Sequence, residues 1–397
     1  MPQTSEQQNN GRASREQQSA AERTEISILR YILDHPSSTR RDTAQGLRLS
    51  FPNVCRLVAG FQEQGTVVED HLKQTGKRGP RSKTLSLKAD LGCTIGVDLE
   101  STHVRGIILD FSNEICGVFR KPITADASGD RVVSSVAEAA VSLVHTAREQ
   151  SLHVSAVGLA LPGPVIDQAN GRVRTELQGG RAEMEFVPTV REACGVDTYA
   201  TANDICFALG HHRLRHSDED TTDLLVLNRF GLSAAMVRGG DLYSGHLGLL
   251  PYGTGRPIRH YRDVCTGSAI LRQARSGNDG RSFQELISSP EDPLVSKWLA
   301  TAIPAFAQAV FSAALMYSPD RLIIEGIFNN LSKDVRTEMI GTVEEEIARL
   351  GMPAPEVSFF EGDDLMGARG AAFIARDQIA DDLITDIVRA GRDSHDR

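Results

Sequence analysis

The stretch Cys93-Thr-Ile-Gly-Val-Asp-Leu-Glu-Ser-Thr-His-Val-Arg-Gly-Ile-Ile-Leu-Asp110 decides the fold class of this 397-residue chain. Its apolar and β-branched residues predict two strands joined by a tight turn that contains Asp98. A further apolar strand is predicted over Val154–Leu161, and apolar residues at helical spacing predict a helix over Val132–Ala147. Strands that alternate with helices are typical of an α/β sheet.

The same strand-turn-strand pattern returns in Thr222–Asp241. Two similar cores in one chain indicate a duplicated α/β fold with two lobes and a cleft between them. Long apolar helices are predicted over Trp298–Met316 and Val335–Leu350. We expect them to cover the second lobe and to supply a dimer contact.

The composition excludes several classes of protein. With 40% apolar and 24% charged residues the chain is typical of soluble proteins, and its length leaves room for two or three domains. Its six cysteines show no Cys-x-x-Cys pair, which speaks against a disulfide framework or a zinc ribbon. No apolar run approaches the roughly 18 residues of a membrane span, and residues 1–20 lack the apolar core of a signal peptide. We therefore expect a cytoplasmic protein.

The charges are unevenly distributed along the chain. The formal net charge is −9, yet residues 22–90 carry 12 Lys and Arg against 8 Asp and Glu, so the remainder at 91–397 is acidic. Residues 1–21 are rich in Gln, Ser and Asn and are expected to form a disordered tail. We divide the rest into a basic head at 22–90, a body at 91–380 and a C-terminal tail at 381–397.

The basic head shows the pattern of a winged helix-turn-helix, in which three helices precede a two-stranded hairpin and the third helix enters the major groove of DNA. Apolar residues at helical spacing and N-cap residues mark the helices. The expected elements are helices from Glu22 to His35-Pro36, from the cap candidates Ser37–Thr39 onward and from Ser50 to Gly65, then strands at Thr66–Leu72 and Thr84–Lys88.

Polar side chains of the third helix are suited to reading bases. An asparagine amide can read adenine, and an arginine can pair with guanine or with a phosphate. Two arginines of the second helix would lie near the DNA backbone. The predicted contacts are Ser50, Phe51, Asn53 and Arg56 on the third helix, with Arg40 and Arg41 on the second.

Six basic residues and no acidic one lie between Lys73 and Lys88. Two glycines and a proline keep this backbone thin and extended, which suits an A·T-rich minor groove. The alternative is a solvated basic loop. The position directly after a helix-turn-helix pattern favours DNA binding, and the predicted contacts are Lys77, Arg78 and Arg81.

Six short motifs follow one another through the body. They are Ile95–Asp98 with Thr102, Gly158–Val165, Ala202–Asp204, Gly239–Gly245, Ser318–Ile324 and Gly362–Ala372. In order and spacing they cover nearly all of residues 93–375 and resemble the ROK family (repressor, open reading frame, kinase). The head resembles the repressor branch of that family, since Leu49–Val58 stands at its recognition helix and Lys77–Arg81 at its basic wing.

The resemblance implies two α/β lobes of the actin-like ATPase type with a sugar bound in the cleft. Kinases of the family use one carboxylate as the general base on a sugar hydroxyl. Asp204 stands at that position with Asn203 beside it, which implies that both contact a ligand. The alternative is that this Asn-Asp pair caps a helix that begins near Ile205.

Three elements depart from the family's nucleotide site. The first turn, Glu100-Ser101-Thr102, places a carboxylate where the negative phosphates of a nucleotide would come. The second turn, Asn228-Arg229-Phe230-Gly231, is bulky where the kinases have small residues, and the late Gly-Gly reads Glu325-Gly326. The departures imply a non-catalytic kinase homologue with no catalytic residue and no cofactor.

The ligands of the family's structural zinc are replaced as well. Leu249 stands at the histidine position and His260 alone remains in place of the cysteine cluster, so we predict no metal. His246 and Arg262 stand at or near two glutamates that accept hydrogen bonds from sugar hydroxyls in the family, which makes this wall neutral or cationic. The predicted ligand contacts are Asn203, Asp204, His246, His260 and Arg262.

Three hypotheses follow for the cleft. It binds an acidic or phosphorylated sugar-like effector, it no longer binds sugar, or His246 and Arg262 pair with local carboxylates. The sequence leaves the three open.

Together these inferences predict a cytoplasmic ROK-like transcriptional regulator of the repressor type, acting in carbohydrate metabolism. It would bind double-stranded operator DNA as a homodimer or a dimer of dimers, because a reader of a palindrome needs two-fold symmetry. A sugar, sugar acid or sugar phosphate would shift lobe closure and so the spacing of the DNA heads. The alternatives are an ATP-dependent sugar kinase with a fused DNA-binding head, and a DNA-binding scaffold without effector.

Overall fold

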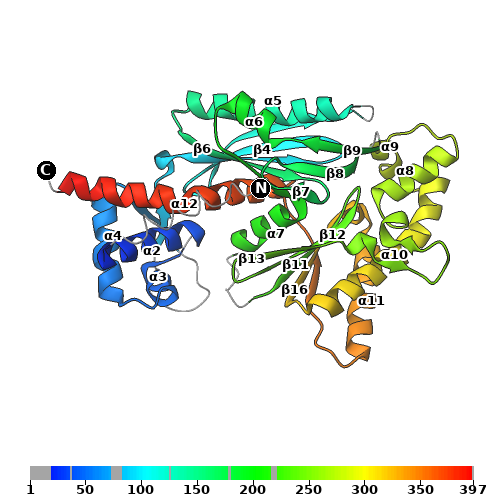
Figure 1. Cartoon of the computed structure of the whole chain (residues 1–397). Coiled ribbons are helices and arrows are strands. Elements are labelled where there is room, and N and C mark those ends of the chain that lie inside the picture. The colour runs from blue at the N-terminus through cyan, green and yellow to red at the C-terminus, as the bar shows by residue number, and fades with distance from the viewer. Residues whose placement is uncertain are drawn as a thin grey trace, which may run out of the picture. The chain divides into compact units, whose positions relative to one another are not determined.

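The computed structural model describes residues 19–35, 38–72, 83–124, 127–177, 180–215 and 221–395. They form two compact units, whose elements are labelled in Figure 1. The smaller unit comprises Met1–Gly92, Asp110–Glu114 and Asp377–Arg397, and the larger unit comprises Cys93–Leu109 and Ile115–Arg376. The predicted tail at 1–21 lies almost wholly outside the described residues.

The smaller unit has the predicted order of elements. Ser19 caps the first helix by accepting a hydrogen bond from the backbone N–H of Glu22, and Thr39 opens the second in a capping box with Asp42. Ser50 occupies the N-cap of the third helix, as predicted, but its hydroxyl makes no capping bond. The elements are α2 (Ala20–Asp34), α3 (Arg40–Gly46), α4 (Phe51–Glu63) and the antiparallel strands β1 (Val67–Leu72) and β2 (Lys83–Leu87).

The core of the smaller unit includes the end of the chain. The helix α12 (Met366–His395) contributes Ala380, Ile384 and Val388, which are buried with the apolar faces of α2 and α4. Arg392 of α12 bonds Glu25 of α2 at 2.8 Å. The prediction of a C-terminal tail at 381–397 is therefore wrong as far as residue 395. The i, i+4, i+8 spacing of the three apolar residues marks a helix face that must be covered.

The first lobe of the larger unit is a five-stranded sheet in the order β10-β6-β3-β4-β5. Strands β3, β6 and β10 run parallel, whereas β4 and β5 are antiparallel. The helices α5 (Gly129–Glu149) and α6 (Val187–Cys194) pack on one face (Figure 1). The strands are β3 (Cys93–Leu99), β4 (His103–Asp110), β5 (Ile115–Pro122), β6 (Val154–Leu161) and β10 (Thr198–Ala202).

Two details of this sheet differ from or extend the sequence prediction. Asp98 lies inside β3 and the turn follows at 100–102, so the predicted turn began too early. Gly96 of β3 allows the first part of α12 to approach closely, because an added Cβ would lie 1.8 Å from the carbonyl oxygen of Ala368. A small sheet of β7 (Val165–Asp167), β8 (Arg172–Leu177) and β9 (Gly180–Glu185) is attached to this lobe.

The second lobe repeats the strand order of the first. Its sheet runs β13-β12-β11-β16-β17, again with one antiparallel meander on one side and two parallel strands on the other. The prediction of a duplicated fold is thus confirmed by topology. The strands are β11 (Asp223–Asn228), β12 (Leu232–Arg238), β13 (Asp241–Gly245), β16 (Arg321–Gly326) and β17 (Glu356–Phe359).

Helices cover both faces of the second sheet. The helix α7 (Asn203–Leu214) packs Phe207 against one face, and α10 (Pro293–Tyr317) and α11 (Lys333–Arg349) cover the other (Figure 1). Between β13 and α10 lie α8 (Gly267–Ser276), α9 (Phe283–Ile287) and the two-residue strands β14 (Pro251–Tyr252) and β15 (Arg259–His260).

Among the described residues, one helix, α10, is long and apolar enough to cross a membrane by length and composition. Its side chains Trp298, Phe306 and Val310 are buried in the core of the second lobe. A helix that is apolar on most sides is expected in such a core position.

Candidate functional site

A cavity of about 390 Å³ lies between the two lobes. Its walls come from the ends of the parallel strands: Pro162–Pro164 after β6, Asn203 after β10, and the turn after β11. In α/β folds ligands bind outside the carboxyl ends of the strands, so this is the candidate ligand site.

Asp204 is the buried carboxylate of the cavity, with 3% of its surface exposed. One oxygen accepts a hydrogen bond from the backbone N–H of Ile205, and the other accepts one from the Ser244 hydroxyl, both at 2.8 Å. Burial raises the pKa of Asp204, and the hydroxyl and backbone donors together with nearby His246 act in the opposite direction. The N-cap position of α7 is held by Ala202, so the alternative of an Asn-Asp helix cap is wrong.

Of the five predicted ligand contacts, four line this cavity: Asn203, Asp204, His246 and Arg262. His260 does not line it. Its ring lies 3.4 Å from Asp263 and its backbone N–H donates to the same carboxylate, because β15 leads directly into a short helix that Asp263 caps. The prediction for His260 is therefore wrong in position.

Arg262 forms only a long ion pair with a carboxylate. Its Nε lies 3.8 Å from Asp263, which is closer to Arg272 at 3.3 Å and to His260 at 3.4 Å. One carboxylate thus faces three potential cations. The hypothesis that Arg262 is neutralised by a local carboxylate is weakened by this geometry, because a long and partly exposed ion pair contributes little.

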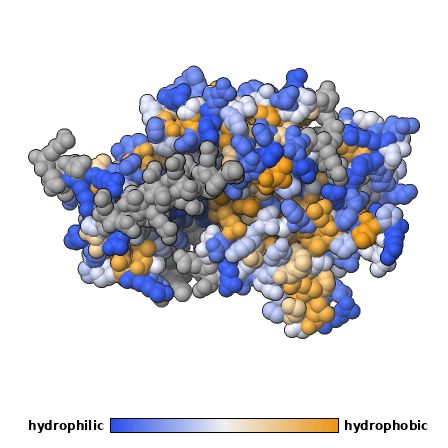
Figure 2. Space-filling view, viewed as in Figure 1, coloured by the Kyte–Doolittle hydropathy of each residue, from blue (hydrophilic) through white to orange (hydrophobic). Residues whose placement is uncertain are grey.

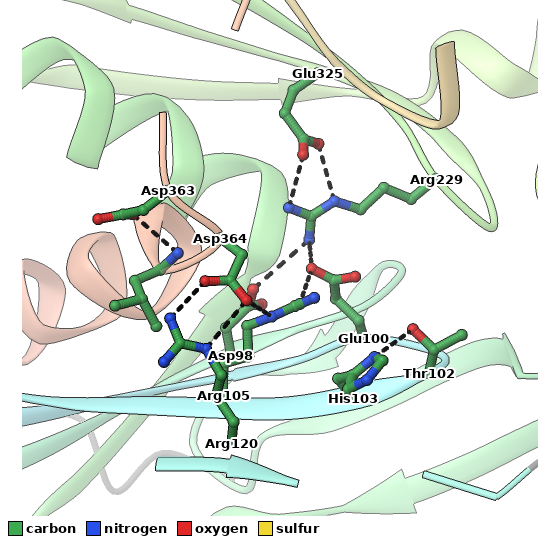
Figure 3. A network of polar contacts seen from close by, with 11 residues as sticks. Asp98, Glu100, Thr102, His103, Arg105, Arg120, Arg229, Glu325, Asp363 and Asp364 are labelled. Carbon is green, nitrogen blue, oxygen red and sulfur yellow. Dashed lines mark hydrogen bonds and ion pairs between the residues drawn. The ribbon is translucent and has the colours of Figure 1, made fainter. Parts of the chain in front are cut away.

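Glu100 and Arg229, which line the cavity, belong to an ion-pair network that Figure 3 shows. Arg229, from the turn after β11, donates two hydrogen bonds to Glu325 at 2.9 and 3.2 Å. Its third nitrogen pairs with Glu100 of the first lobe and lies 3.6 Å from Asp98. One guanidinium therefore connects the end of β3 with the ends of β11 and β16.

The network continues into the first lobe. Arg105 of β4 donates to Glu100 at 2.5 Å and to Asp364 at 2.8 Å, and Arg120 of β5 donates to Asp364 at 2.7 Å (Figure 3). The hydrogen bond from Arg120 and the charge of Arg105 lower the pKa of Asp364 to about 2. This part of the network keeps a carboxylate ionised near the surface.

Asp98 is the fully buried member. Neither of its oxygens accepts a hydrogen bond from any described residue, and Arg229 is its nearest cation. Burial raises its pKa to about 7, although Arg229 opposes the shift. The carboxyl group is held in a place where ionisation is costly.

The network unites the three departures that the sequence showed separately. Glu100, Arg229 and Glu325 stand at the first turn, the second turn and the late Gly-Gly, and Arg229 pairs with both glutamates. The contributions of Asp98 and Arg105 were not predicted from the sequence. An aspartate in an otherwise apolar strand was the available signal, because a buried charge needs a partner.

No group of three or more His, Cys, Asp or Glu side chains that could hold a metal occurs within the described ranges. Leu249, which stands at the family's zinc-ligand position, is 48% exposed. The absence of zinc stays a prediction.

Most of the predicted DNA contacts that the structure describes are exposed on the smaller unit. Ser50, Phe51 and Arg56 are exposed on α4, and Arg56 donates to half-buried Asn53 at 3.1 Å. Arg41 is exposed on α3. The remaining predictions, Lys77, Arg78 and Arg81, lie outside the described residues.

Arg40 is held within the smaller unit. Its guanidinium donates two hydrogen bonds of 3.1 Å to Glu69 and one of 2.7 Å to Gln62. These bonds tie α3 to β1 and α4. Its predicted contact with DNA stays a prediction. The guanidinium N–H groups named above already donate within the smaller unit.

Residues 94–253 match the ROK family profile. A curated protein of Caldicellulosiruptor sp. (strain Rt8B.4), described as "Putative xylose repressor", is 23% identical over 242 residues. The alignment covers 60% of this chain and 59% of that protein, so the match spans less than two thirds of the relative.

Solved structures share the fold. A ROK family transcriptional regulator described as a homolog of the E. coli MLC protein aligns with a TM-score of 0.64 and 15% identity, covering 92% of this chain and 98% of its own. The ROK hexokinase of Thermus thermophilus aligns with a TM-score of 0.56 and 21% identity over 73% of this chain and 99% of its own. A glucokinase of Streptomyces griseus gives 0.55 and 17% over 72% and 100%. The mixed α/β larger unit has the fold of these ROK structures, and the chain contains a ROK family domain at residues 94–253.

Proposed function

We propose that this protein is a ROK transcriptional regulator of the repressor type that acts in the cytoplasm. The smaller unit binds double-stranded operator DNA, and the larger unit is a non-catalytic sensor. The description of the curated relative as a repressor supports this proposal. So does the match of a regulator structure over 92% of the chain, where the hexokinase and glucokinase structures cover 72–73%.

The observation that carries the non-catalytic part is the Arg229 network. In a ROK kinase the two turns would have to admit phosphate oxygens. Here Glu100, Glu325 and Asp98 surround the one guanidinium, and it is already engaged by all three. A nucleotide would meet carboxylates and would have to displace buried ion pairs, which is unfavourable on both counts.

The head is proposed to be a winged helix-turn-helix. One face of α4 is buried through Val54, Val58 and Phe61, which leaves the opposite face for the major groove. The proposed contacts on α4 are Ser50, Phe51, Asn53 and Arg56. Arg41 and the segment with Lys77, Arg78 and Arg81 are proposed to contact phosphates and the minor groove. Arg40 is proposed to act mainly by positioning α3.

Regulation is proposed to come from a small effector in the cavity between the lobes. Asn203, Asp204, His246 and Arg262 supply acceptors and donors for hydroxyl groups or an acidic group. A sugar, sugar acid or sugar phosphate is the expected class.

A homodimer or a dimer of dimers is proposed as the active form. The larger unit exposes apolar side chains that an interface would cover, and Figure 2 shows hydrophobic residues at the surface of its second lobe. Met316 and Leu350, at the ends of α10 and α11, are 57% and 54% exposed. This supports the predicted dimer contact of the two helices.

Fluorescence anisotropy with labelled duplexes from the protein's own promoter region tests DNA binding. We expect Arg56→Ala to weaken binding by about 1–3 kcal/mol. Arg23→Ala is the matched control, because Arg23 is exposed on α2 outside the proposed interface. Equal effects of the two variants would contradict the assignment of α4.

ADP release with a panel of hexoses tests the alternative of a sugar kinase. We expect no turnover by the full chain. Turnover that is lost in Asp204→Asn, in a protein that ignores its promoter DNA at low ionic strength, would replace the proposal by the kinase alternative.

A further inference from the structure

A second cavity of about 570 Å³ lies along β17, the edge strand of the second sheet. The end of α7, the first turns of α11 and the residues that follow β17 form its walls. It shares no lining residue with the cavity between the lobes. The proposed regulator function gives it no role.

Three cations line this second cavity and form no ion pair with any residue that the structure describes. Arg215, Lys333 and Arg336 have no carboxylate within 4 Å in the part of the chain that the structure describes. The arginines around the first cavity differ, since Arg229 bonds three carboxylates. Unpaired cations gathered in one hollow favour an anionic ligand.

Of the three cations, Arg336 has the most closely defined surroundings. Its guanidinium carbon lies 5.5 Å from the centre of the Phe359 ring, within the range of a cation–π interaction. Its Nε is buried and donates to no described acceptor. A buried donor without an acceptor costs free energy, which an acceptor oxygen placed in the cavity would offset.

The other lining groups leave the cavity positive. Glu356 and Glu361 are exposed at its rim and pair with none of the three cations within the described ranges. His211 adds no charge, because burial lowers its pKa to about 4, with nearby Arg215, Arg321 and His212 acting in the same direction and Asp223 against. Among the described lining residues, three cations therefore face two carboxylates.

We infer that the second cavity binds a phosphate-bearing small molecule, with the phosphate held by Lys333, Arg336 and Arg215. Planar guanidinium groups match phosphate oxygens in pairs, and charge-assisted hydrogen bonds are the strong ones. The hydroxyls of Thr337 and Ser358 and the ring of Phe360 offer polar and apolar contacts to the rest of the molecule.

The size of the cavity agrees with a small ligand. Small-molecule sites commonly have roughly 300–1,000 Å³. An acidic peptide that added a strand to the sheet edge would find only the four residues of β17 to pair with. A sugar phosphate and a nucleotide share the chemistry, and the experiment separates them.

Isothermal titration calorimetry of the full chain at low ionic strength tests the inference. The probes are glucose 6-phosphate, AMP and inorganic phosphate, with glucose and sulfate as controls. We expect glucose 6-phosphate or AMP to bind and glucose and sulfate not to bind. Equal binding of all anions, or of none, would overturn the inference.

Variants locate the binding. Lys333→Ala and Arg215→Ala should each weaken the bound probe by about tenfold, as expected for one charge-assisted contact. Lys297→Ala and Arg238→Ala are matched controls, because both side chains are exposed elsewhere in the larger unit. Arg336→Lys keeps the charge but loses the planar fork, so it should also weaken binding while the chain stays folded.

Two outcomes would assign the ligand elsewhere. Binding that is lost in Arg262→Ala and kept in Lys333→Ala would place the phosphate in the cavity between the lobes and overturn the inference. Failure of every phosphate probe together with Lys333-dependent binding of a glutamate-rich peptide would replace the small molecule by a peptide. Neither outcome affects the anisotropy test of DNA binding, so the two proposals can fail separately.

Discussion

The turn after β3 in the first lobe and the turn after β11 in the second lobe occupy equivalent places in the duplicated fold. Their side chains nevertheless carry opposite charges. Glu100 follows β3 in the first lobe, and Arg229 follows β11 in the second. Because the turns face each other across the cavity, the two side chains pair directly. The two turns therefore form a contact between the lobes. The comparison shows that equivalent turns of a duplicated fold can carry opposite charges and pair with each other.

Breaking the contact from the second lobe should have the largest effect. Arg229→Ala leaves Glu100, Glu325 and Asp98 without their shared cation, and breaking a buried ion pair from one side costs about 3–5 kcal/mol. Urea denaturation measures the loss. Arg238→Ala, an exposed arginine at the end of β12, should change stability by less than about 0.5 kcal/mol. Similar losses in the two variants would mean that the network contributes little.

A double-mutant cycle sharpens the comparison by measuring one bond. Arg229→Gln and Glu325→Gln should show a coupling of about 1–3 kcal/mol, because the two side chains are in bidentate contact. Glu325→Gln combined with Arg238→Ala should be additive within about 0.5 kcal/mol. Additivity in both cycles would contradict a specific contact.

The pH dependence of stability isolates Asp98. Its pKa is raised from 3.8 to about 7 by burial, so between these values the unfolded chain releases the proton and the folded chain keeps it. The contribution of Asp98 therefore makes the protein less stable as pH rises from about 4 to about 7. Asp98→Asn should remove this decline, as measured by urea midpoints over that window. An unchanged decline would assign it to other groups.

The smallest effect is expected at the exposed end of the network. Arg120 and Asp364 are both nearly half exposed, so Arg120→Ala should cost less than about 1 kcal/mol. The same change should raise the pKa of Asp364 from about 2, because the Arg120 hydrogen bond is the largest cause of that value. An NMR titration of the carboxyl carbon follows the shift. A pKa that stays near 2 would mean that Arg105 alone suffices.

Local patterns predicted most of the fold. The apolar runs located both strand-turn-strand units, and caps such as Thr39 located helices of the head. The error at Asp98 has a clear cause: a charged residue in an apolar run suggests a turn, whereas a distant cation allows it to stay in the strand.

The candidate site could be predicted only in part. Glu100, Arg229 and Glu325 were each visible as departures, but their pairing depends on how segments more than 90 residues apart meet. The second cavity could not be predicted for the same reason, since Arg215 and Lys333 lie at helix ends far apart in sequence. The apolar spacing of Ala380, Ile384 and Val388 was readable and would have corrected the predicted C-terminal tail.

The last helix, α12, gives its first part to the larger unit and its final part to the core of the smaller one. Excising residues 22–90 to study promoter recognition in isolation would thus strip away Ile384 and Val388, and the apolar face that they cover would meet water. Such a fragment should be prone to aggregation. A premature stop codon that removes the end of α12 should likewise destabilise the N-terminal helices of the smaller unit. Truncation experiments on this protein need to retain both ends together.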